Sequence, residues 1–87
     1  MKERVVKINN ETGIHARPAS MIVQEANKFS ADVLIEKDGT EVNAKSIMGI
    51  MSLGISNSVE IKVKADGEGA QEAVDAIVKL IEDGFGE

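Results

Sequence analysis

The sequence contains no cysteine, which excludes disulfides, cysteine-ligated zinc and thiol catalysis. It has no tryptophan or tyrosine and only two phenylalanines, so few rings are available for nucleic-acid bases to stack on. A net charge of −5 also argues against binding to a phosphate backbone. No hydrophobic run approaches the roughly 20 residues of a membrane-spanning helix, and no segment reads as a signal peptide. We expect a cytoplasmic protein that neither contacts nucleic acid directly nor inserts into a membrane.

What remains is ordinary globular composition, with 43% hydrophobic and 29% charged residues in 87. This length is enough for one domain, residues 1–87, with a core that needs no disulfide or metal. Alternating hydrophobicity predicts strands and a spacing of three to four residues predicts helices. The expected strands are 2–8, 32–37, 41–44 and 59–65, and the expected helices are 16–28, 46–53 and 70–83.

The resulting order is βαββαβα. Each strand has one polar side, and each helix has one apolar stripe, so the elements are expected to form two layers. The helices would cover one face of the sheet, and the other face would be exposed to water.

The segment Gly13–Ala19 (GIHARPA) holds the only histidine and the only proline of the chain. An imidazole such as that of His15 offers a neutral ring nitrogen near pH 7, which a phosphoryl acceptor needs. The backbone N–H groups of Ala16 and Arg17, in the first turn of the expected helix, have no carbonyl partner within it and attract anions. The guanidinium of Arg17 is a planar fork of donors suited to a phosphoryl dianion. One tension with the expected helix 16–28 remains, because a residue before proline is pushed away from helical angles. The alternative is that Arg17 is a non-helical residue of the first turn, which would suit a side chain that swings onto a phosphate.

A simpler interpretation of His15 competes with this one. A lone histidine near a helix start is more often a solvated cap or turn residue than a nucleophile, and short motifs recur freely. A metal site is not expected, because no second histidine and no cysteine accompany His15. We expect no cofactor.

A second segment, from Ser46 to Leu53, is read as a short helix with Ser46 as its N-cap. If Ile50 and Leu53 are buried, other large apolar side chains of this helix remain exposed, which favours a surface for several partners. The alternative is that they fill an irregular core. A phosphate on Ser46 would add up to about 2 negative charges beside this surface without unfolding the helix. The residues expected to line the surface are Ser20, Met21, Ile47, Met48 and Met51.

Together, Gly13–Ala19 and residues 45–54 (KSIMGIMSLG) resemble the histidine-containing phosphocarrier (HPr) family of the bacterial phosphoenolpyruvate:sugar phosphotransferase system. The resemblance covers essentially the whole chain, and the segment around Ser46 is similar to that of the Gram-positive type. It implies an α+β open-faced sandwich, with an antiparallel sheet in the order 1-4-2-3 and three helices on one face.

The resemblance also implies a function in sugar transport. His15 would accept a phosphoryl group on Nδ1 from enzyme I and pass it to enzyme IIA units, with assistance from Arg17. HPr kinase/phosphorylase would phosphorylate Ser46, and this form would bind a catabolite control protein in carbon catabolite repression. The chain would be a carrier without turnover of its own, and we expect a monomer. A regulatory paralogue in the family lacks the active histidine, so His15 argues against that paralogue.

Two other functions remain as alternatives. One is a purely regulatory module whose main output is phosphorylation of Ser46. The other is a hydrolase with a phosphohistidine intermediate, which would need further acid–base groups and a deep pocket.

Overall fold

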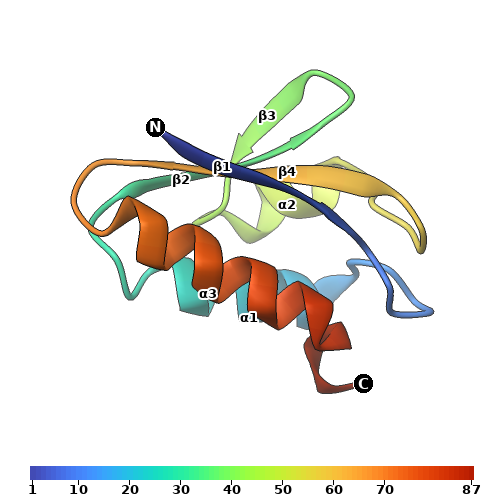
Figure 1. The fold of residues 1–87 in the computed structure, drawn as a ribbon. Helices are drawn as coiled ribbons and strands as arrows, with labels where there is room; N and C mark the ends of the chain where they lie inside the picture. Colours follow the sequence, from blue (N-terminus) through green and yellow to red (C-terminus); the bar gives the residue numbers. More distant parts are fainter.

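The computed structural model describes residues 1–87 and has the predicted order of strands and helices (Figure 1). A single 3₁₀ turn, η1, follows the last helix. The elements are β1 (Lys2–Lys7), α1 (Ala16–Ala26), β2 (Asp32–Lys37), β3 (Thr40–Asn43), α2 (Ile47–Ser52), β4 (Glu60–Asp66), α3 (Ala70–Glu82) and η1 (Gly84–Gly86).

The four strands form one antiparallel sheet in the order β1-β4-β2-β3. Val6 of β1 lies opposite Ile61 of β4, and Val63 of β4 lies opposite Ile35 of β2. This register places the apolar residues of neighbouring strands on the same face, because side chains alternate along a strand. The predicted α+β open-faced sandwich with sheet order 1-4-2-3 is therefore confirmed.

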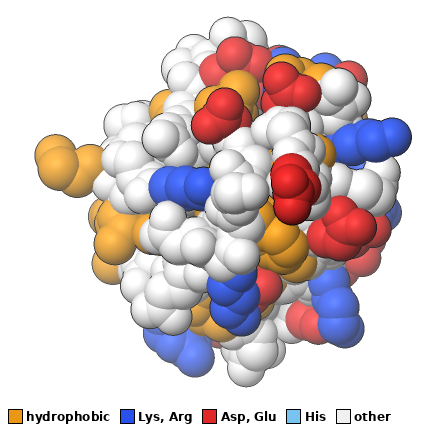
Figure 2. Space-filling view, turned by 90° about the vertical axis from the view of Figure 1, so that its left-hand side faces the viewer, with side chains coloured by type: hydrophobic (Ala, Val, Ile, Leu, Met, Phe, Trp, Pro, Cys, Tyr) orange, Lys and Arg blue, Asp and Glu red, His pale blue; other side chains and the backbone are white.

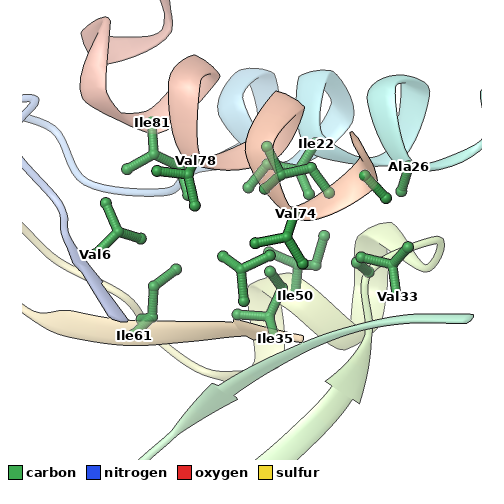
Figure 3. Packing of buried hydrophobic residues seen from close by; sticks show 14 of the residues in the cluster. Val6, Ile22, Ala26, Val33, Ile35, Ile50, Ile61, Val74, Val78 and Ile81 are labelled. Atoms are coloured by element: carbon green, nitrogen blue, oxygen red, sulfur yellow. The ribbon is translucent and has the colours of Figure 1, made fainter. Parts of the chain in front are cut away.

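The hydrophobic core lies between this sheet face and the helices, which run along one side of the sheet (Figure 1). Side chains from α1 and α3 point toward those of the strands, as the close view of Ile22, Val74 and Ile35 shows (Figure 3). These three side chains are essentially inaccessible to water. Burial of each branched side chain stabilises the fold by roughly 1.5–3 kcal/mol.

The opposite face of the sheet carries charge. Lys64 Nζ on β4 lies 2.6 Å from Glu36 Oε1 on β2 and 2.5 Å from Glu41 Oε2 on β3. Contact with these two carboxylates raises the pKa of Lys64, and the contact with Lys64 lowers the pKa of Glu36. The ion pairs link three neighbouring strands on the face that no helix covers.

Several boundaries differ from the sequence-based predictions. The first helix ends at Ala26 instead of residue 28, because the amides of Lys28 and Phe29 bond three residues back, to Glu25 and Ala26. These tighter bonds are typical of a last turn. Leu53 is only partly buried, unlike Ile50. The chain also continues beyond Gly84, and Phe85 returns into the core with a positive φ of 58°.

No helix of the structure is both long enough and apolar enough to span a lipid bilayer.

Candidate functional site

The loop before α1 is held against a second loop by close backbone contacts. The amide of Ile14 donates to the carbonyl of Ile55 at 3.0 Å, and the Asn57 side chain donates to the Asn10 carbonyl at 3.0 Å. Gly13 has φ +67°, and a Cβ atom there would lie 2.7 Å from the Ile55 oxygen. Only glycine fits this approach. Ile14 is buried, so the residue that precedes His15 is anchored in the core.

His15 is the N-cap residue of α1, with extended backbone angles of −98° and −162°. Its carbonyl accepts the first helical hydrogen bond, from the Ala19 amide at 3.0 Å, but its side chain forms no capping hydrogen bond. The imidazole is 47% exposed. The backbone is thus fixed on both sides of a ring that remains accessible to water and to a docking protein.

The first turn of α1 supplies possible contacts for an anion. The amides of Ala16 and Arg17 precede the first helical bond and have no carbonyl partner within the helix. Pro18, which lacks an amide hydrogen, is buried and occupies the position where that hydrogen would be unpaired. Arg17 is exposed and forms no ion pair. It belongs to the helix, as the predicted start at residue 16 requires, and the non-helical alternative is not observed: the bias before proline is outweighed by the hydrogen bond from the Ala19 amide to the His15 carbonyl, which spans Arg17.

One neighbour of His15 has no counterpart in the sequence-based predictions. Glu87 Oε2 lies 3.4 Å from His15 Nε2. Its Oε1 accepts from Thr12 Oγ1 at 3.0 Å and from Asn10 Nδ2 at 3.4 Å. The hydrogen bond from Thr12 is the main cause that lowers the pKa of Glu87, with smaller contributions from Asn10 and His15. No local sequence signal joins residues so far apart; only the packing of η1 beside the loop brings them together.

A hollow of about 420 Å³ lies beside this contact. It has no hydrophobic lining residue, and His15 is not part of its wall. Four of its lining side chains are carboxylates, so it is unsuited to hold a phosphate. The lining residues are Asn9, Asn10, Glu11, Thr12, Glu82, Asp83, Gly84 and Glu87.

Ser46 caps α2 as the sequence predicts: its Oγ accepts from the Gly49 amide at 3.0 Å. The large apolar side chains of this short helix are unequally exposed, with Met48 84% exposed, Met51 45% and Ile47 41%. Ile50 is the one that enters the core.

On α1, Ser20 and Met21 are only partly exposed, and Met21 packs against the core. The two helices α1 and α2 are in contact. The exposed apolar side chains of α2 therefore lie next to α1, the helix whose N-cap is His15.

The site lies at one end of the molecule. The start of α1 and the C-terminal residues are both on the right of Figure 1. The opposite end, shown in Figure 2, carries interspersed acidic and basic side chains with small apolar areas between them, and no histidine is visible there. Nowhere does the structure gather three or more histidine, aspartate or glutamate side chains in a group able to hold a metal ion.

Comparisons with known proteins place this chain in a known family. A family model described as "PTS HPr component phosphorylation site" matches residues 2–83. The chain is 47% identical over 83 residues to the HPr-like protein Crh of Bacillus subtilis (strain 168), which covers 95% of this chain and 98% of that relative.

Solved structures agree. HPr-C-His from Thermoanaerobacter tengcongensis is 55% identical, with a TM-score of 0.96 over 100% of this chain and 98% of that one. An HPr dimer from the same organism, also 55% identical over 100% of both chains, gives a TM-score of 0.80. Phosphocarrier protein HPr from Bacillus anthracis str. Ames is 48% identical, with a TM-score of 0.88 over 92% of this chain and 95% of that one.

A family match over nearly the whole chain, together with the superposition on solved HPr structures, shows that this chain belongs to the PTS HPr family and is a phosphocarrier-like protein, not an enzyme.

Proposed function

We propose that this chain is a phosphoryl carrier of the sugar phosphotransferase system, with His15 as the acceptor. The observation that carries the proposal is an exposed imidazole at the N-cap of α1, beside two first-turn amides without helical partners. An exposed ring can be reached by a donor protein and then by an acceptor protein. A ring enclosed in a pocket would be suited to catalysis within the chain instead.

The transfer is a displacement at phosphorus. The lone pair of His15 Nδ1 attacks the phosphorus atom carried by enzyme I, and the bond from phosphorus to the donor atom breaks with its electron pair left on the donor. The ring then carries a P–N bond and a proton on Nε2. In the second step a nucleophile of an enzyme IIA unit attacks the same phosphorus, and the P–N pair returns to Nδ1.

Arg17 and the amides of Ala16 and Arg17 are proposed to contact the phosphoryl oxygens. A helix N-terminus attracts anions, and a guanidinium fork matches phosphoryl geometry. The absence of any competing ion pair leaves the Arg17 side chain available for this role. These contacts are few, and few contacts suit a carrier, because a tightly stabilised phosphohistidine would lose transfer potential.

Ser46 is proposed as a second, regulatory phosphorylation site, used by HPr kinase/phosphorylase. Its hydroxyl lies at the start of α2, next to the exposed side chains of Ile47 and Met48. A phosphate there changes the charge of the surface on which partners dock. The phosphorylated form is proposed to bind a catabolite control protein and to be a poor substrate for enzyme I.

The docking surface is proposed to comprise the exposed apolar residues of α2 together with part of α1. Met48, at 84% exposed, contributes apolar area without a role in the core. Methionine adapts to differently shaped partners, which suits a chain with several of them. The proposed members are Ser20, Met21, Ile47, Met48 and Met51. The chain is proposed to act as a monomer, which sedimentation at several concentrations tests.

The similarity to Crh, a solved structure of which is described as the Bacillus subtilis catabolite repression HPr, supports a second candidate. This candidate is a regulatory module whose main output is phosphorylation of Ser46. The two candidates differ at His15, which only the carrier needs as a nucleophile. The test is to incubate the wild type, His15→Ala and Ser46→Ala with enzyme I and phosphoenolpyruvate, and separately with ATP and HPr kinase/phosphorylase.

For a carrier, the first mixture gives an acid-labile, base-stable phosphate that is absent in His15→Ala and moves on to an enzyme IIA unit. The second gives an acid-stable phosphate that is absent in Ser46→Ala. Equal labelling of His15→Ala by enzyme I would refute the role of His15. Labelling by the kinase alone would favour the regulatory module. Rapid release of inorganic phosphate from the isolated labelled chain would instead support a hydrolase.

A further inference from the structure

The imidazole of His15 has one ring nitrogen beside a fixed carboxylate. Glu87 Oε2 lies 3.4 Å from Nε2. The other carboxylate oxygen is bound by Thr12 at 3.0 Å and by Asn10 at 3.4 Å. Asn10 is itself held, since its side-chain amide donates to the Gly13 carbonyl at 2.6 Å. The carboxylate is therefore attached to the same loop that positions His15.

A neutral imidazole carries one proton, on either nitrogen, and only the nitrogen without the proton has a lone pair to attack phosphorus. A carboxylate accepts hydrogen bonds and donates none. A proton on Nε2 faces Glu87 favourably, whereas a lone pair on Nε2 would be repelled by it. The contact therefore favours the tautomer in which Nδ1 is free.

We propose that Glu87 is a positioning residue for the carrier: held by Thr12 and Asn10, it keeps the His15 proton on Nε2 and leaves Nδ1 as the nucleophile. This inference rests on the proposed function for its biological meaning, but the tautomer exists whether or not a phosphoryl donor is present. Glu87 does not contact the phosphoryl group in this scheme.

The other charged groups near the ring do not take this role. Glu82 and Asp83 line the neighbouring hollow but are paired with Arg4 at 3.8 Å and Lys79 at 3.2 Å. Glu11 also lines the hollow and has no ion pair, but it does not lie within 4 Å of a ring nitrogen. Arg17, on the first turn of α1, has only hydrogen-bond donors and cannot accept a proton from Nε2. Glu87 is the only carboxylate within 4 Å of the imidazole nitrogens. The effect is therefore assigned to one contact instead of the general acidity of the hollow.

The experiment is ¹⁵N NMR of the His15 ring at about pH 9, well above the ordinary imidazole pKa. We expect the wild type to show the shifts of an Nε2-protonated ring. In Glu87→Gln the Nδ1-protonated fraction is expected to rise roughly 3- to 10-fold, the size expected for loss of one polar contact at a partly exposed site. Thr12→Val, which removes one of the two hydrogen bonds that hold the carboxylate, is expected to move the shifts the same way by a smaller amount.

Two variants separate position from charge. Glu11→Gln removes the same charge from the wall of the same hollow and is expected to leave the ring shifts unchanged. Glu87→Asp keeps the charge on a shorter side chain and is expected to restore part of the wild-type tautomer ratio. Unchanged shifts in Glu87→Gln, or equal changes in Glu87→Gln and Glu11→Gln, would overturn the proposal.

The outcome is distinguishable from that of the labelling experiment. If enzyme I fails to label wild-type His15, the carrier function fails, while the tautomer measurement still reports on Glu87. If His15 is labelled and the Glu87→Gln spectrum equals that of the wild type, only the positioning role of Glu87 fails. If both proposals are correct, Glu87→Gln should accept the phosphoryl group more slowly than Glu11→Gln at the same enzyme I concentration.

Discussion

The Cα atom of Gly13 approaches the carbonyl oxygen of Ile55 so closely that a side chain would have no room: a Cβ atom would lie 2.7 Å from that oxygen. The positive φ of +67° adds strain for any other residue. We predict that Gly13→Ala lowers the free energy of unfolding by about 2–4 kcal/mol. Gly39→Ala is the matched control, because Gly39 also has a positive φ, +83°, but nothing lies near its Cβ position. Urea denaturation of both variants measures the difference, and equal losses would contradict a steric role for Gly13.

Arg17 is predicted to matter for transfer and not for folding. Its side chain is exposed and unpaired, so Arg17→Ala should change stability by less than about 0.5 kcal/mol. Loss of a charged donor to the phosphoryl oxygens should slow labelling of His15 by enzyme I roughly tenfold or more. Arg17→Lys should recover part of the rate, since it keeps the charge without the fork. An unchanged labelling rate in Arg17→Ala would remove Arg17 from the site.

Met48 tests the docking surface. With 84% of this residue exposed, Met48→Asp should cost less than about 0.5 kcal/mol in stability. The new charge in an apolar contact should weaken binding of enzyme I or of the kinase, as measured by calorimetric titration. Ile50→Ala, a buried neighbour on the same helix, should do the reverse and destabilise the fold by about 2–4 kcal/mol. Normal binding by Met48→Asp would argue that α2 is not part of the surface.

The proposed effect of negative charge at position 46 can be tested without the kinase. Ser46→Asp keeps a helix-capping side chain and adds a charge, whereas Ser46→Asn caps equally well and adds none. If charge is the regulatory signal, labelling of His15 by enzyme I should slow in Ser46→Asp and remain near the wild-type rate in Ser46→Asn. Equal rates for the two variants would argue that charge at this position does not control access of enzyme I.

The ion pairs on the open sheet face predict a pH dependence. The pKa of Glu36 is lowered by Lys64. Its carboxylate therefore stabilises the fold at pH values above its ordinary pKa of 4.5, and this contribution is lost as the pH falls through the lowered pKa. The pKa of Lys64 is raised, so its contribution is complete below 10.5 and is lost as pH rises through the raised value.

The contribution of these pairs is therefore largest between these limits. Lys64→Met should be less stable than the wild type near neutral pH, and the difference should shrink as the carboxylates become protonated in acid. Denaturation at several pH values measures it. Lys79→Met, which breaks the exposed pair with Asp83, should show little difference at any pH. A Lys64→Met difference that is constant with pH would assign the effect to packing.

The sequence predicted the parts of this structure that depend on local periodicity. The alternation of Val59–Ala65 and the stripe of Ala73, Val74 and Ile77 identify a strand and a helix because burial of one face imposes those spacings. The cap at Ser46 was likewise recognisable from residue type and position alone.

Features that depend on the approach of distant segments were not predicted. Glu87 reaches His15 only because η1 packs beside the loop 9–13, and nothing near either residue in the sequence indicates this contact. Phe85 enters the core through a left-handed backbone conformation that its own residue type disfavours. The end of α1 and the helical state of Arg17 were set by particular hydrogen bonds, which propensity does not resolve.

The carboxylate-lined hollow beside the contact between Glu87 and His15 also affects which molecules can approach a phosphoryl group on His15. The carboxylates repel small anions such as inorganic phosphate and free nucleotides from this hollow, so an anion can approach the ring only from the side of the first turn of α1. If the chain is the proposed carrier, a partner protein must supply positive groups for the phosphoryl group and apolar contacts for the side chains of α2. Selectivity would then come from groups that this chain lacks. The larger partner protein that supplies them would determine when the phosphoryl group is transferred.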